Sequence, residues 1–205
     1  MHRIVFIATL AVLLGSCANP AESQHDARAR QDQFNVPKCS DADISLLDYD
    51  VLAAVLAHIV TTSSCKPGSW KEILLADTIG PSSHTTNRTE ILNQITPLGP
   101  KLDAVDNLIC RNQQTTTLLA PPSSSIPRHL LHPSEIGDLD QLMQSYPNAS
   151  ALVNLSIPGY DITGTQAVVY YAKACGSLSA EGFYAIVERG PNGWTVVRSM
   201  SIWIA

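Results

Sequence analysis

Residues 165–205 read TQAVVYYAKACGSLSAEGFYAIVERGPNGWTVVRSMSIWIA, a composition that indicates a β-sheet. Three segments of this stretch are rich in β-branched and aromatic residues, and Gly, Pro or Asn bound each of them. A fourth such segment, ALVNLSI (151–157), precedes them and is followed by the turn sequence PGYDITG (158–164). Because connections this short join antiparallel neighbours, the sequence predicts a C-terminal antiparallel meander of four strands.

The preceding part of the chain favours helices. Apolar residues recur with the spacing of amphipathic helices in three segments, residues 44–59, 102–109 and 136–146. A further helix is expected to begin near Asn87 and to stop at Pro97, and a short strand is expected at residues 73–76. We therefore expect an α+β fold in a single domain over residues 38–205, with the N-terminal helices packed on one face of the meander.

The first seventeen residues carry an export signal. They read MHRIVFIATLAVLLGSC, a short basic start followed by an apolar run that is too short to span a membrane as a helix. The last four, Leu14-Gly15-Ser16-Cys17, resemble the lipobox of bacterial lipoprotein precursors. The resemblance implies that residues 1–16 are removed as a signal peptide and that Cys17 is modified by diacylglycerol and then acylated, for example with palmitate. Ala18 after the cysteine implies the outer membrane, with the protein facing the periplasm.

Residues 17–37 comprise this cysteine and a polar segment that has few large apolar side chains. Such a segment cannot bury enough surface to offset its ordering entropy, and we expect a flexible tether to the bacterial cell envelope. The whole chain has 13 Lys and Arg against 18 Asp and Glu, without a cluster of basic residues. This balance argues against nucleic acid as a partner and against broad attraction to anionic lipid, so the lipid anchor is the expected contact with the membrane.

Four cysteines follow the lipobox, at positions Cys39, Cys65, Cys110 and Cys175. An even number of cysteines in an exported chain predicts disulfide bonds, and three pairings are possible. We favour Cys39 with Cys65, because the two flank one predicted helix, and this choice leaves Cys110 with Cys175. The other two pairings stay open.

The last third of the chain also resembles a group of uncharacterised bacterial exported proteins with the motifs TQA, CG-x-L and G-x-W. That group usually carries a second cysteine after CG-x-L, where this chain has Ser179. The resemblance implies a fold and export from the cytoplasm, but it implies no biochemical activity. The matching residues are Leu155, Ser156, Gly159, Thr165, Gln166, Ala167, Tyr170, Cys175, Gly176, Leu178, Gly182, Trp194 and Trp203.

Signals for catalysis are weak. The chain has no G-x-S-x-G, Walker A, H-E-x-x-H or dinucleotide-binding motif, so we predict no catalytic residue, metal or cofactor. The alternative is a thiol-dependent or metal-assisted envelope enzyme. Cys175 would be the nucleophile of the former, and His129 with His132 would hold the metal of the latter.

Large aromatic side chains gather on the predicted sheet. We expect one face to be covered by helices. The other face is a candidate binding surface for a peptide or glycan, with Tyr170, Tyr184, Trp194 and Trp203 as its residues. Cross-strand packing is the other interpretation of these aromatics, and it is the one we favour. The sequence thus predicts an envelope-anchored lipoprotein with a non-enzymatic binding or interaction domain, whose partner is an envelope protein or a cell-wall component. A purely structural or immunity-type lipoprotein is a further alternative.

Overall fold

The computed structural model describes residues 37–39, 44–62, 65, 70–176 and 179–205, which belong to one compact unit, Val36–Ala205. The predicted signal peptide, Cys17 and all but the last residue of the predicted tether lie outside the described residues. Among the helices that the structure describes, none is both long and apolar enough to cross a membrane.

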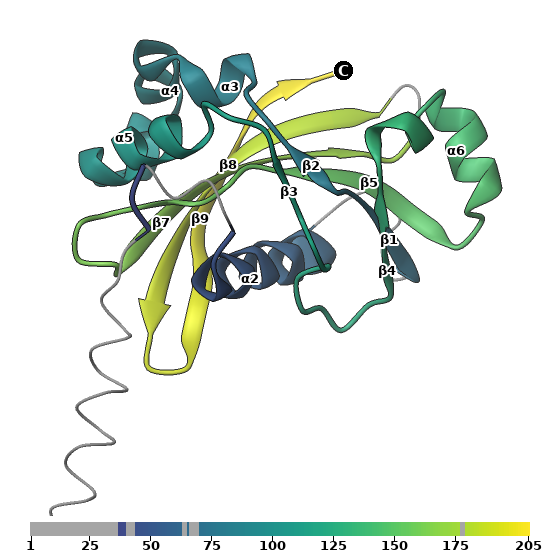
Figure 1. Cartoon of the computed structure of the whole chain (residues 1–205), viewed down its shortest axis with the longest axis horizontal. Helices are drawn as coiled ribbons and strands as arrows, with labels where there is room; N and C mark the ends of the chain where they lie inside the picture. The colour runs from purple at the N-terminus through teal and green to yellow at the C-terminus, as the bar shows by residue number, and fades with distance from the viewer. Residues whose placement is uncertain (1–36, 40–43, 63–64, 66–69, 177–178) are drawn as a thin grey trace, which may run out of the picture. The chain divides into compact units, whose positions relative to one another are not determined.

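A mixed β-sheet runs through the centre of this unit (Figure 1). Its order is β4-β1-β5-β7-β8-β9, and β6 also pairs with β7. β1 is parallel to both β4 and β5, whereas the other neighbours are antiparallel. The strands are β1 (Glu72–Ala76), β4 (Arg128–Leu131), β5 (Ala149–Leu155), β6 (Gly159–Tyr160), β7 (Gln166–Ala174), β8 (Ala180–Gly190) and β9 (Gly193–Ile204).

The mixed composition of helix and sheet agrees with the sequence, but the predicted four-stranded antiparallel meander is wrong. In the part of the chain that the structure describes, the sheet has seven strands and includes parallel pairs. The antiparallel neighbours β5, β7, β8 and β9 were predictable because short turns connect most of them. β1 and β4 join through long connections, for which no local turn signal exists.

Helices cover both faces of the sheet, and not one face as predicted. α2 (Leu46–Thr62) lies on one face, while α4 (Arg88–Ile95), α5 (Leu102–Arg111) and α6 (Leu139–Ser145) lie on the other. The reason is visible in β7, whose alternate side chains Val169 and Tyr171 pack toward α2, while Val168 and Tyr170 pack toward α4 and α5. A strand that is apolar on both sides needs cover on both sides.

The remaining elements are short. A two-stranded sheet pairs β2 (Thr78–Ile79) with β3 (Thr116–Thr117), and this pair is separate from the central sheet. α3 (Ser83–Thr86) is a single turn that precedes α4, and 3₁₀ turns occupy Thr96–Leu98 and Pro133–Glu135. β6 lies against α5 at Gly159, where a Cβ atom would come within 2.2 Å of the Leu108 amide nitrogen, so this contact requires glycine.

A fully buried ion pair joins α2 to α5. Arg111 donates from Nη1 and Nη2 to the two carboxylate oxygens of Asp48, at 2.7 and 3.0 Å. The Tyr160 hydroxyl donates to the same carboxylate at 2.9 Å, and Arg111 also donates to the Pro158 carbonyl at 2.8 Å. Burial, reinforced by the charge of Asp48, raises the pKa of Tyr160 well above its ordinary value and keeps it a donor. The network therefore holds α2, α5 and the β6 segment together.

Two disulfide bonds clamp the two ends of α2. Cys39 is bonded to Cys110 at the end of α5, and Cys65 is bonded to Cys175 at the end of β7. Disulfide bonding is as predicted, but the favoured pairing of Cys39 with Cys65 is wrong. The two cysteines do flank α2, yet its 17 residues hold its ends far apart, so each cysteine reaches the element packed beside it.

Candidate functional site

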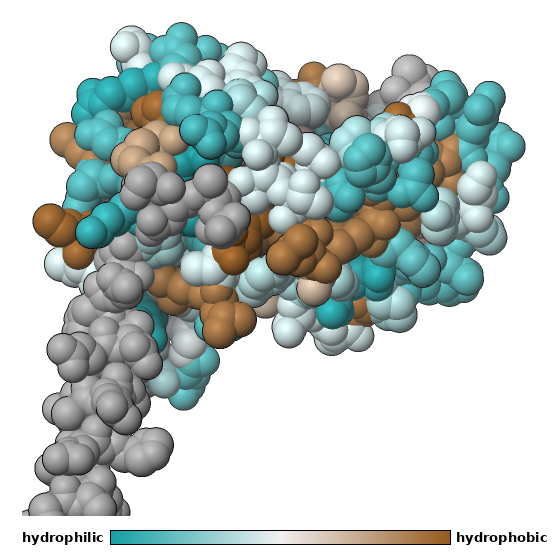
Figure 2. Space-filling view, in the orientation of Figure 1, coloured by the Kyte–Doolittle hydropathy of each residue, from teal (hydrophilic) through white to brown (hydrophobic). Residues whose placement is uncertain are grey.

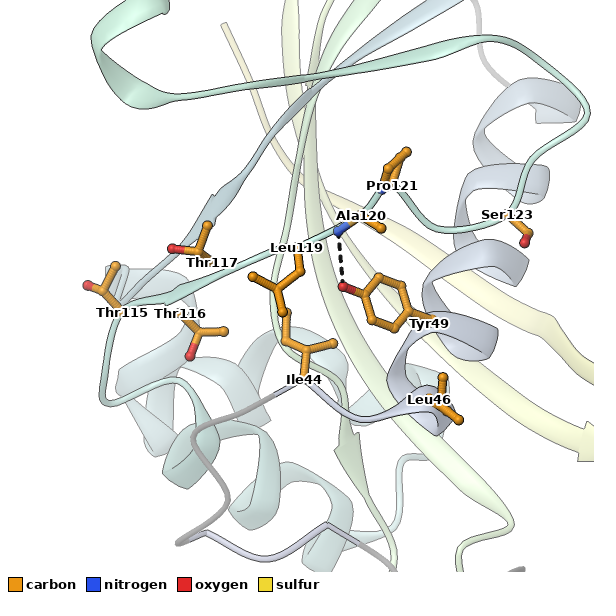
Figure 3. Close-up of a pocket in the computed structure, with 10 residues that line it drawn as sticks. All are labelled: Ile44, Leu46, Tyr49, Thr115, Thr116, Thr117, Leu119, Ala120, Pro121 and Ser123. Atoms are coloured by element: carbon orange, nitrogen blue, oxygen red, sulfur yellow. Dashed lines mark hydrogen bonds between the residues drawn. The ribbon is translucent and has the colours of Figure 1, made fainter.

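An open groove lies between the start of α2 and the segment that carries β3, with a volume of about 870 Å³ (Figure 3). The two walls come from parts of the chain about seventy residues apart. The lining residues are Ile44, Leu46, Tyr49, Thr115, Thr116, Thr117, Leu119, Ala120, Pro121 and Ser123.

The first wall is fixed by the cap of α2. The backbone amide and hydroxyl of Ser45 both donate to Asp48, at 2.7 and 2.8 Å, and the Asp48 amide lies 3.3 Å from the Ser45 hydroxyl. This is a capping box, with an aspartate in the position of the usual glutamate. Because Arg111 holds the same carboxylate, the cap cannot shift independently of α5. Ile44, Leu46 and Tyr49 are therefore presented from a rigid helix start.

The second wall is the strand β3 and the residues after it. β3 pairs with β2 through Thr78 with Thr117, and the Leu118 amide donates to the Asp77 carbonyl at 2.7 Å. Along this extended segment Leu118 turns into the core, whereas Leu119 is 91% exposed. The Ala120 amide lies 3.4 Å from the Tyr49 hydroxyl, a contact that ties the two walls together across the groove (Figure 3).

The groove combines apolar side chains with hydroxyl groups. Leu46 and Leu119 are among the most exposed apolar residues of the described chain, at 86% and 91%. Figure 2 shows apolar surface over α2 and the segment that carries β3. Among the described residues that line the groove, none is Asp, Glu, His, Lys, Arg or Cys. Such a surface can bind an apolar ligand and hydrogen bond to it, but the described side chains that line it offer no acid–base pair at neutral pH.

The structure places the four predicted aromatic residues within packing interfaces. Tyr184 is fully buried and Tyr170 is 8% exposed, both beneath α4 and α5. Trp203 is half-buried and donates to the Tyr170 hydroxyl at 3.1 Å. Trp194 lies on the other face of the sheet, edge-on to Tyr160 at 5.9 Å. The candidate binding surface is therefore corrected: these four residues do not share a face, and two of them are buried.

Each residue considered for catalysis is bonded or hydrogen bonded to another side chain of the protein. Cys175 is bonded to Cys65 and carries no thiol. His129 Nε2 lies 2.6 Å from a carboxylate oxygen of Glu72, while His132 caps the next turn through Nδ1, 2.8 Å from the Ser134 hydroxyl. The two imidazoles thus face different partners. Within the described ranges, no three His, Cys, Asp or Glu side chains are grouped closely enough to hold a metal ion.

Comparisons with protein-family models, with curated proteins and with solved structures gave no match to this chain. The resemblances to lipoprotein precursors and to the TQA, CG-x-L and G-x-W group therefore stay predictions.

Sequence reasoning missed the groove. Leu46 is apolar but falls off the stripe that the helix buries, and Leu119 lies beside Leu118 in a segment too short to assign a face. The positions of these two leucines outside the buried apolar pattern were the feature of the sequence that could have indicated the groove. Whether two such leucines meet depends on the contact between α2 and the residues after α5, and one sequence does not reveal that contact.

Proposed function

We propose that the protein is an envelope lipoprotein whose α+β domain binds an extended, partly apolar segment of a partner protein in the groove between α2 and β3. The observation that carries the proposal is the exposure of Leu46 and Leu119, at 86% and 91%, on the two walls of one open groove. Burying either side chain fully is worth about 1.5–3 kcal/mol, so a ligand that covers both gains a useful part of its affinity from them.

An extended peptide suits this groove better than a purely apolar ligand. The side chains of Thr115 and Thr117 are exposed along one wall, where their hydroxyls can bond to peptide amides and carbonyls. β3 is an edge strand of the two-stranded sheet, and edge strands are the usual docking place for extended peptides. The buried Asp48–Arg111 pair holds the start of α2, which forms one wall, so that wall is in place before a ligand arrives.

The proposed location in the cell envelope is supported by the lipobox, Leu14-Gly15-Ser16-Cys17, and by the disulfide bonds. Disulfide bonds persist in oxidising compartments such as the periplasm, and both bonds of this chain fit that location. Lipidation at Cys17 would hold the domain at the outer membrane on a tether of about twenty residues, within reach of other envelope proteins.

The proposal is tested by placing a charge in the groove. Leu119→Asp and Leu46→Asp are compared with Ile162→Asp, a matched control because Ile162 is 84% exposed and does not line the groove. Each tagged full chain is purified from cross-linked membranes, and co-purifying proteins are quantified by mass spectrometry. We expect a partner that is lost with both groove variants and retained with the control. Equal recovery of every partner from all three variants would contradict the proposal.

A further inference from the structure

A second cluster of polar side chains lies near the other end of α2, and its residues do not line the groove. His58 of α2 places its Nε2 atom 3.0 Å from the hydroxyl oxygen of Ser199 on β9. The Tyr171 hydroxyl of β7 is hydrogen bonded to the same serine. Side chains from α2 and β7 thus meet at the hydroxyl group of Ser199 on β9, which lies 141 residues after His58 in the sequence.

Ser199 lines a hollow of about 230 Å³ between α2 and the sheet. The Phe183 and Tyr171 rings stack along it with centroids 4.9 Å apart. Lys173, which is only 5% exposed, lines the same hollow, 3.2 Å from the Glu181 carboxylate and 5.2 Å from the centre of the Phe183 ring. The serine itself is exposed, so a small molecule in the hollow can reach it.

The contact permits proton transfer from the serine to the histidine when the imidazole carries its proton on Nδ1. Burial lowers the pKa of His58, which favours the neutral form of its imidazole. With its proton on Nδ1, the imidazole accepts from Ser199 through Nε2. A neutral imidazole within hydrogen-bond distance of a hydroxyl is the arrangement that activates a serine nucleophile.

We propose that Ser199 is a nucleophile toward small acyl esters bound in this hollow, with His58 as its general base. The serine oxygen attacks the ester carbonyl carbon, and its proton passes to His58 Nε2. When the tetrahedral intermediate collapses, the ester C–O bond breaks and the alcohol leaves with that proton. Water then attacks the acylated serine, His58 takes up the water's proton and returns it to Ser199, and a carboxylic acid is released.

The surrounding residues set the substrate class. The Tyr171 hydroxyl is beside the reacting oxygen and can donate to the carbonyl oxygen as its negative charge develops. Lys173 and Glu181, which are paired at 3.2 Å, both line the same hollow, so their charges offset each other there. A volume of about 230 Å³ and the aromatic wall of Phe183 suit a short acyl group or a small aryl ester.

A fluorophosphonate probe with a small alkyl group tests the proposal on the full chain. The serine oxygen forms a bond to phosphorus, fluoride leaves, and the modified peptide is mapped by mass spectrometry. We expect the adduct on Ser199 of the native protein. Because mapping needs no variant, this result does not depend on how any substitution folds. An adduct on other serines only, or no adduct at all, would overturn the proposal.

Variants separate activation by His58 from simple exposure. His58→Gln should lower the labelling rate about 100-fold, the low end of what a general base contributes. Ser201→Ala is the matched control, since Ser201 is also exposed on β9 and its hydroxyl oxygen lies 3.5 Å from the Trp203 carbonyl oxygen. It should label at the native rate. Equal labelling of the His58→Gln variant and the native chain, with both shown to be folded by their thermal unfolding, would contradict the proposed role of the histidine.

Discussion

Removing Arg111 should cost the protein about 3–5 kcal/mol of stability, because the change leaves the Asp48 carboxylate buried and uncompensated. Both side chains are fully buried and share two hydrogen bonds of 2.7 and 3.0 Å. Arg111→Met retains most of the apolar volume of the side chain and removes its charge and donors. The remaining donors to Asp48, Tyr160 and Ser45, are neutral and cannot replace the guanidinium.

The assay is urea unfolding with both disulfides intact, near 15 °C, where stability is close to its maximum. Arg111→Met, Asp48→Asn and the double variant form a cycle. We expect each single change to cost several kcal/mol and the double change to cost less than their sum by about 2–3 kcal/mol, since it leaves neither charge alone.

An exposed pair provides the control for this cycle. Arg88 lies 2.6 Å from Asp106, and both side chains are about half exposed, so Arg88→Met should leave the unfolding midpoint nearly unchanged. Costs for the Arg111→Met and Asp48→Asn variants that simply add, or a loss below about 1 kcal/mol for Arg111→Met, would refute the reasoning that this pair holds α2 to α5.

Three further results follow from the structure. Gly159→Ala should destabilise the fold by roughly 3 kcal/mol in urea unfolding, because its Cβ atom would overlap the backbone of α5; an unchanged midpoint would show that this contact is looser. Burial alone would raise the pKa of Asp161, but hydrogen bonds from Lys101, Thr163 and two backbone amides outweigh it and hold the pKa well below its usual value. Asp161 therefore contributes stability above about pH 4, where the unfolded carboxyl is ionised, and this contribution fades as the pH falls further. In thermal unfolding, the loss caused by Asp161→Asn should accordingly be present at pH 7 and shrink below pH 4; a loss that is the same at both pH values would argue against this. Replacing both Cys65 and Cys175 by serine should cost about 5 kcal/mol, as expected for a loop of 110 residues, and a change under 1 kcal/mol would count against that bond.

The part of the fold that was predicted correctly is the part that local sequence features, such as turns and apolar periodicity, determine. The turn after Leu155 and the Gly190–Gly193 connection predicted antiparallel strands, and helices were expected where the apolar stripe of Val51, Val55 and Ile59 now packs on the sheet. The pairing of β1 with β5 could not be predicted from the sequence, because about seventy residues separate the two strands. The covering of both faces by helices was hinted at only by the apolar character of both sides of the strands.

The candidate sites were harder to predict for the same reason. Tyr170 and Tyr184 sit opposite each other on β7 and β8, so their shared face was predictable, but its cover by α4 and α5 was not. Ser199 carries no motif at all, and only the packing of α2 on β9 brings His58 to it. Non-local contacts thus decide both the groove and the serine site.

The central claim is that the groove between α2 and β3 binds a partner segment, and photo-crosslinking from position 119 tests it most directly. A photoreactive amino acid replaces Leu119 in the full chain, and a second version carries it at the equally exposed position 162. Both are activated in intact cells, and the attached peptides are sequenced. The account predicts a discrete partner peptide with apolar side chains at 119 and none at 162. Attachment only to lipid, only to residues 18–36 of the same chain, or to the same peptides from both positions would contradict it.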